Sequence, residues 1–164
     1  MSDFIIQIGE MLAPEQVAEM LRDRPGMKDR PIVIRRFDWG SAVIQPPPGR
    51  GYQPFEENGK LFACTGRPRM IGISHENSGE NGFCRELAQS LEHDLATELP
   101  ASITGMFALA MFQSDGFRVV TDMLGSQPVY KAESASKNVV CVGTNADLVT
   151  AIVGHRRELD LVSI

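Results

Sequence analysis

One segment of the chain constrains the fold more than any other. The run Met106–Gln113 is almost wholly apolar, and the turn sequence Ser114-Asp115-Gly116 follows it directly. This pattern predicts a β-strand and a hairpin turn, with Arg118–Thr121 as the return strand. Because the apolar run lacks polar alternation, we expect both faces of its sheet to be covered. The sequence therefore predicts stacked β-layers.

Further segments show strand or helix patterns. The predicted strands are Phe4–Ile8, Ile32–Phe37, Ser41–Gln45, Lys60–Thr65, Val129–Ala132 and Val139–Gly143. Three helices are predicted. The first begins near Pro14 and ends before Pro25-Gly26, and the second runs from Phe83 to about Leu99. The third follows a cap at Asn145 and stops at Gly154. Gln45–Asn58 holds four prolines and is predicted to be an exposed loop. Since few strand–helix–strand units occur, we expect an α+β fold of two mainly antiparallel sheets with helices outside.

Composition limits the function classes. The chain has 164 residues, which suggests one domain, and its net charge of −5 argues against nucleic-acid binding. Three widely spaced cysteines, Cys64, Cys84 and Cys141, indicate small apolar side chains rather than a disulfide framework or a zinc site. His75, His93 and His155 show no metal-ligand spacing, so no metal is expected. No apolar run is long enough to span a membrane, and a cytoplasmic location is expected.

Two arginines are the clearest binding candidates outside the apolar runs. Arg67 and Arg69 flank Pro68 directly after a predicted strand. Their guanidinium groups suit a carboxylate or a phosphate, although a solvated turn has the same composition. One hypothesis is therefore a small-molecule or peptide-binding module, with the Gln45–Asn58 loop as a lid over these arginines.

The turn after Thr121 combines several residues with defined backbone roles. Asp122 can accept backbone N–H bonds, Gly125 can adopt positive φ, Pro128 fixes the approach to the next strand, and Tyr130 can pack its ring and bond its hydroxyl. From Gly105 to about Val153 the order and spacing resemble the amino-terminal class II glutamine amidotransferase domain of the asparagine synthetase family. That family carries "GMFAFALWD", "RDRxGxxPLYY" and "FASE" segments. The resemblance implies a four-layer αββα sandwich of the Ntn-hydrolase type over residues 1–157, with 158–164 starting a linker to an absent synthetase domain.

The same resemblance implies that the glutaminase chemistry is lost. The family's nucleophile is its first residue after methionine removal, and Ser2 stands at that place, followed by Asp3-Phe4 instead of Gly-Ile. In the oxyanion segment Gly66 is retained, but Thr65 replaces the asparagine. We find no counterpart of the family's substrate-binding "HRRLSI" and "SDTE" segments. β-Lactam synthetases and the macrolactam-forming cyclases of lasso peptides are similar in not using glutamine as nitrogen donor.

The leading hypothesis is thus a non-catalytic amidotransferase-like domain that acts as scaffold or interface for an ATP-dependent, amide-forming synthetase. Its partner would be an ATP-pyrophosphatase-type domain or subunit acting on a peptide or amino acid. ATP and Mg²⁺ are expected in that partner, and no cofactor is expected in this chain. The alternative enzyme hypothesis is an autonomous amidohydrolase that uses Ser2 as nucleophile with Thr65 and Gly66 as oxyanion residues.

Overall fold

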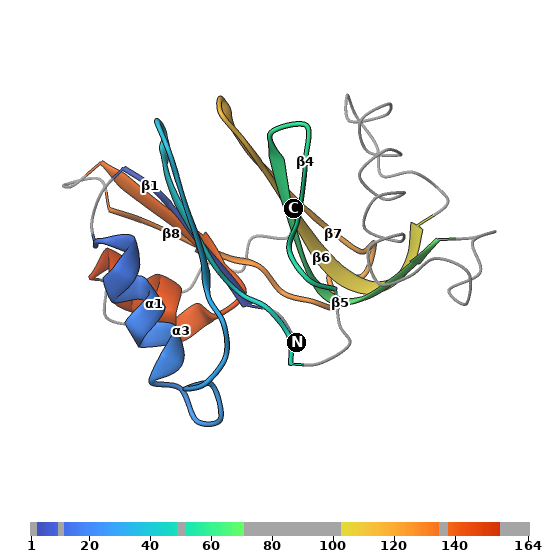
Figure 1. Cartoon of the computed structure of the whole chain (residues 1–164), viewed down its shortest axis with the longest axis horizontal. Helices are drawn as coiled ribbons and strands as arrows, with labels where there is room; N and C mark the ends of the chain where they lie inside the picture. The colour runs from blue at the N-terminus through green and yellow to red at the C-terminus, as the bar shows by residue number, and fades with distance from the viewer. Residues whose placement is uncertain (1–2, 10–11, 49–51, 71–102, 135–137, 155–164) are drawn as a thin grey trace.

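The computed structural model describes residues 3–9, 12–48, 52–70, 103–134 and 138–154. They form two antiparallel sheets and two helices, a mixed α+β architecture (Figure 1). The first sheet, sheet A, holds β1 (Asp3–Ile8), β2 (Val33–Phe37), β3 (Gly40–Gln45), β8 (Tyr130–Ser134) and β9 (Val139–Gly143). The second, sheet B, holds β4 (Phe55–Glu57), β5 (Lys60–Met70), β6 (Ile103–Gln113) and β7 (Gly116–Thr121). The helices are α1 (Pro14–Arg22) and α3 (Ala146–Val153).

Sheet A has the strand order β2-β3-β1-β9-β8. Its central strand β1 pairs with β3 along its whole length, from Asp3 opposite Gln45 to Ile8 opposite Gly40. On its other side β1 pairs with β9, where Ile5 lies opposite Gly143. A continuous apolar strand such as β1 is stable at the centre because both of its faces are covered.

Sheet B is a meander with the order β4-β5-β6-β7. Its longest pairing joins β5 to β6, from Leu61 opposite Phe112 to Met70 opposite Ile103. The prediction that the strand stops at Thr65 is therefore wrong, and so is the interpretation of residues 66–69 as a turn. The strand continues through Pro68 because β4 pairs only as far as Phe62, so the proline lies where β5 has no β4 partner for a backbone N–H.

Three clusters of buried side chains lie between or against the layers. The first lies between the sheets and includes Phe4, Ile44 and Phe112. The second lies between sheet A and the two helices, which cover the same face of that sheet (Figure 1). The third lies on the outer face of sheet B and includes Phe62 and Leu109. Alternate residues of β6 belong to the first and third clusters, which confirms that both faces of this apolar strand are buried.

The helix and loop predictions vary in accuracy. The cap at Asn145 is confirmed, because its side chain accepts a hydrogen bond from the Leu148 N–H (3.0 Å) and Gly154 ends α3 with φ of 76°. The predicted loop Gln45–Asn58 contains the short strand β4, and the strand predicted at Val129–Ala132 begins one residue later and extends to Ser134. The predicted helix from Phe83 to Leu99, the three histidines, Cys84 and the linker 158–164 lie outside the described residues.

One side chain joins the two sheets at the end of the molecule where the β2–β3 turn lies. Trp39 donates its indole N–H to the carbonyl oxygen of Gln113, 2.9 Å away. Its ring stacks on Phe37 at a centroid distance of 4.7 Å and meets Phe117 of sheet B at 5.3 Å. The single tryptophan of the chain is thus part of the contact between the sheets.

Candidate functional site

The turn between β7 and β8 is organised by one carboxylate. Asp122 is buried, and its oxygens accept hydrogen bonds from the backbone N–H groups of Leu124 (3.0 Å) and Ser126 (3.1 Å) and from the Ser126 hydroxyl (3.0 Å). It also accepts the Phe107 N–H of β6 (3.1 Å), while its own N–H bonds back to the Phe107 carbonyl (3.0 Å). The predicted N–H bonding by Asp122 is confirmed, as is the positive φ of Gly125 (60°).

Burial raises the pKa of the Asp122 carboxyl, but the hydrogen bonds outweigh it. Those from Ser126, Phe107 and Leu124 favour the ionised form, and the pKa lies below its usual value. Pro128 follows the turn and is exposed, and the Tyr130 ring packs against the helix-side cluster. The carboxylate is therefore a structural anion that fixes the path of the chain from sheet B to sheet A.

This fixed turn presents apolar side chains to solvent. Met123 and Leu124 are 98% and 87% exposed, and Met106 on the neighbouring β6 is 60% exposed. We call these three residues the apolar patch. Because Asp122 bonds to both Phe107 and Leu124, it holds the turn beside the strand that carries Met106. Apolar side chains that are exposed next to one another are typical of a contact surface, and Met123 and Leu124 are neighbours in the chain.

The predicted oxyanion pair lies within β5 beside this turn. Thr65 is buried, and Gly66 has φ of 90°. A Cβ at Gly66 would stand 2.2 Å from the Met106 carbonyl oxygen and 3.0 Å from the Gln127 Cγ. Gly105 on the partner strand has φ of 100° and comes equally near β5. These glycines let the two strands approach closely, which explains Gly66 without any oxyanion role.

The two candidate arginines are exposed on β5. Arg67 lies opposite Met106 and Arg69 opposite Thr104, so both share the face that carries the apolar patch residue Met106. The described part of the Gln45–Asn58 loop reaches β5 differently, since the Tyr52 hydroxyl donates to the Pro68 carbonyl (2.6 Å) and the Tyr52 ring joins the outer cluster. In the described part of the loop, Tyr52 therefore lies on the face of β5 opposite to the two arginines.

The start of β1, next to the predicted nucleophile Ser2, is held by polar contacts. Ser2 itself lies outside the described residues. Asp3 forms an ion pair with Arg24 (2.7 Å) and accepts a hydrogen bond from the Thr144 hydroxyl (3.0 Å). Phe4 is fully buried, and its N–H donates to the same hydroxyl (3.1 Å). Both residues that follow Ser2 are therefore engaged in holding β1.

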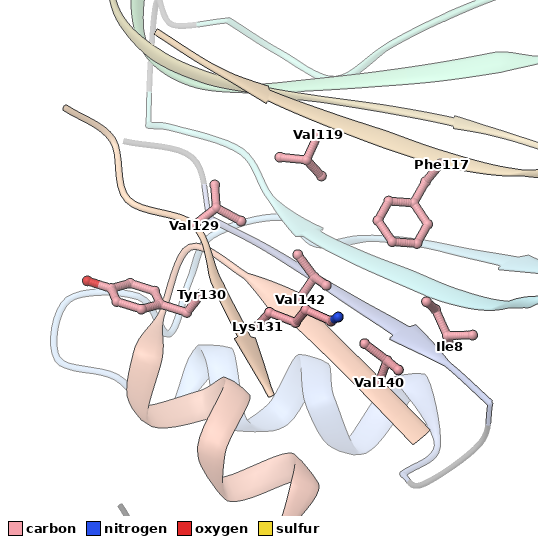
Figure 2. A pocket seen from close by; sticks show the side chains of 8 residues that line it. All are labelled: Ile8, Phe117, Val119, Val129, Tyr130, Lys131, Val140 and Val142. Carbon is pink, nitrogen blue, oxygen red and sulfur yellow. The ribbon is translucent and has the colours of Figure 1, made fainter. Parts of the chain in front are cut away.

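A separate cavity of about 320 Å³ opens between the sheets on the side where β7 faces β8 and β9 (Figure 2). It is lined by Ile8, Phe117, Val119, Val129, Tyr130, Lys131, Val140 and Val142. Neither this cavity nor the apolar patch is among the features predicted from the sequence. The signal for the patch was the pair of large apolar residues inside a turn sequence, while no local pattern indicates a space between two sheets.

Among the described residues, no group of three His, Cys, Asp or Glu side chains comes together as a metal site, and no helix there has the length and apolar character to cross a membrane. Comparisons with protein-family models, curated proteins and solved structures give no match to this chain.

Proposed function

We propose that this chain is a non-catalytic amidotransferase-like domain that acts as an interface for an ATP-dependent, amide-forming synthetase. As part of this proposal, the domain has the four-layer αββα sandwich fold of the Ntn-hydrolase type. In this arrangement α1 and α3 form the first layer and the two sheets form the next two. The fourth layer would cover the outer face of sheet B, whose side chains Phe62, Leu109 and Met111 are buried.

The observation that carries the interface role is the apolar patch. Met123 and Leu124 are almost fully exposed, yet the Asp122 hydrogen bonds fix the backbone that bears them. A turn ordered in this way loses little conformational entropy on association, which favours binding. Arg67, opposite Met106, adds a positive charge beside the patch. We therefore infer a partner surface with apolar side chains and a carboxylate at its edge.

Two observations support a non-catalytic role. The residues that would follow a Ser2 nucleophile hold β1, through the Asp3–Arg24 ion pair and the buried Phe4. Gly66 is explained by the close approach of β5 and β6. The amidohydrolase alternative has no comparable support in the contacts of the described residues.

The test measures binding to an ATP-pyrophosphatase-type synthetase encoded next to this chain. The double substitution Met123→Glu and Leu124→Glu should weaken binding at least tenfold, because it places charges in an apolar contact. The matched control is Ala151→Glu, which adds a charge at an exposed position of α3. Circular dichroism checks that all variants fold.

Binding that is absent in the unmodified chain, or that is unchanged in the double variant, would refute the interface role. Release of ammonia from glutamine by the chain alone, abolished in Ser2→Ala, would establish the amidohydrolase instead. Retention of Met1 in the intact mass excludes that alternative, since its base is the free α-amine of Ser2.

A further inference from the structure

The cavity between the sheets has the character of a binding site for an amphipathic small molecule. Its walls are aliphatic or aromatic, with Phe117 and Val119 from sheet B facing Val140 and Val142 from sheet A (Figure 2). Ligand cavities are typically apolar, of a few hundred Å³ or more, with a few polar groups that fix orientation. At about 320 Å³ this cavity meets the size condition.

Lys131 supplies the polar group. It alternates with Tyr130 along β8, so that Tyr130 packs toward the helices while Lys131 lies on the cavity side (Figure 2). Its ammonium pairs with Glu133, and both side chains are about half exposed, at 42% and 57%. An ammonium carries three N–H donors, so the pair with Glu133 leaves donors for a second acceptor. An exposed ion pair of this kind contributes little energy, so it opposes only weakly a shift of the ammonium toward a carboxylate in the cavity.

We propose that this cavity binds an aliphatic monocarboxylate, with the carboxylate on the Lys131 ammonium and the alkyl chain between β7 and β9. The length follows from the volume. An apolar protein cavity of about 150 Å³ holds benzene, with six non-hydrogen atoms, so twice that volume accepts about twelve, as in a carboxylate of about ten carbons. The inference is independent of the interface role, because the cavity and the apolar patch share no residue.

The experiment measures decanoate binding to the full chain by calorimetry, below the concentration at which decanoate aggregates. Decanol, which has no charge, and decyltrimethylammonium, which has the opposite charge, serve as comparison ligands. We expect decanoate to bind at least tenfold more tightly than either. Lys131→Met should reduce its affinity roughly ten- to hundredfold, as for the loss of a charged hydrogen bond, and Lys131→Arg should retain it. Lys28→Met, which removes an exposed lysine that does not line the cavity, is the matched control.

A second variant tests the cavity itself. Val119→Phe fills the space from the β7 side and should abolish binding of both decanoate and decanol, and Val140→Phe does so from the partly exposed rim if the first variant fails to fold. The proposal is overturned if decanoate does not bind, if Lys131→Met binds it as tightly as the unmodified chain, or if a folded cavity-filling variant still binds it.

Discussion

At the scale of single residues, a few side chains determine the local course of the backbone. Asp122 accepts hydrogen bonds from three backbone N–H groups and one hydroxyl, which joins the β7–β8 turn to β6. Its chemistry was predictable because an aspartate in a turn favours backbone N–H groups. Its bond to Phe107 was not, since that contact joins residues fifteen apart that only the β6–β7 hairpin brings together.

Asp122→Ala should lower the free energy of unfolding by about 3 kcal/mol, since it leaves the buried Phe107 N–H without a partner and removes the hydrogen bonds that order the turn. The effect depends on pH. Because the pKa of Asp122 lies below its usual value of 3.8, its stabilisation is fully present above that pH and is lost as the pH falls through the folded-state pKa. Urea unfolding of both proteins between pH 2 and 7 measures this. Equal losses of stability on acidification in the variant and the unmodified chain would contradict the role of this carboxylate.

Gly66→Ala should destabilise far more than Gly125→Ala. Both positions have positive φ, which costs an alanine about 1–2 kcal/mol. A Cβ meets nothing within 4 Å at Gly125, whereas at Gly66 it collides with the Met106 carbonyl. We expect a loss of roughly 4 kcal/mol or more at Gly66. Comparable unfolding free energies for the two variants would mean that β5 and β6 are not this close.

At the scale of elements, strands and the capped helix were predictable because their signals are local. The apolar periodicity of Met106–Gln113 and the Asn145 cap each depend on neighbours in the chain. The extension of β5 past Thr65 was not predictable, because Gly66 and Pro68 are typical of a turn and only the paired β6 makes them a strand. The cavity was not predictable for the same reason, because it depends on which strands lie together. The apolar pair Met123 and Leu124 did carry a local signal, but its position near Met106 did not.

The two described helices differ in their first turns, which gives a paired prediction. Asn145 caps α3 with its side chain, while Ala13 at the start of α1 has no side-chain acceptor, and its backbone N–H donates to the Gln16 Oε1 (3.0 Å). Asn145→Ala should cost about 1 kcal/mol, and Ala13→Ser should stabilise by about 0.5 kcal/mol or more. Thermal and urea unfolding of the two variants provide the measurement, and a destabilised Ala13→Ser protein would contradict the cap geometry.

At the scale of the whole molecule, the clusters on the two faces of each sheet link the layers. β1 contributes Phe4 to the cluster between the sheets and Ile5 to the cluster under the helices. Each sheet therefore shares its core with the next layer, and we expect the layers to unfold together.

Two buried thiols allow this to be measured. Cys141 lies under the helices, where burial raises its pKa to about 12, and Cys64 lies in the outer cluster of sheet B. In a Cys84→Ser background, a thiol reagent should modify neither cysteine in the native protein, because both thiols are buried and the reagent cannot reach them. As urea is added, both should become reactive at the same concentration. Exposure of Cys64 well before Cys141 would show that the sheets separate first.

The position of Trp39 has a practical consequence for such measurements. Its indole contacts rings from both sheets and donates to a carbonyl at the end of β6. Since the chain has no other tryptophan, the intrinsic fluorescence of Trp39 is an optical probe of the contact between the two sheets. A red shift in its emission will report the moment at which water enters between the layers, without any label having been attached.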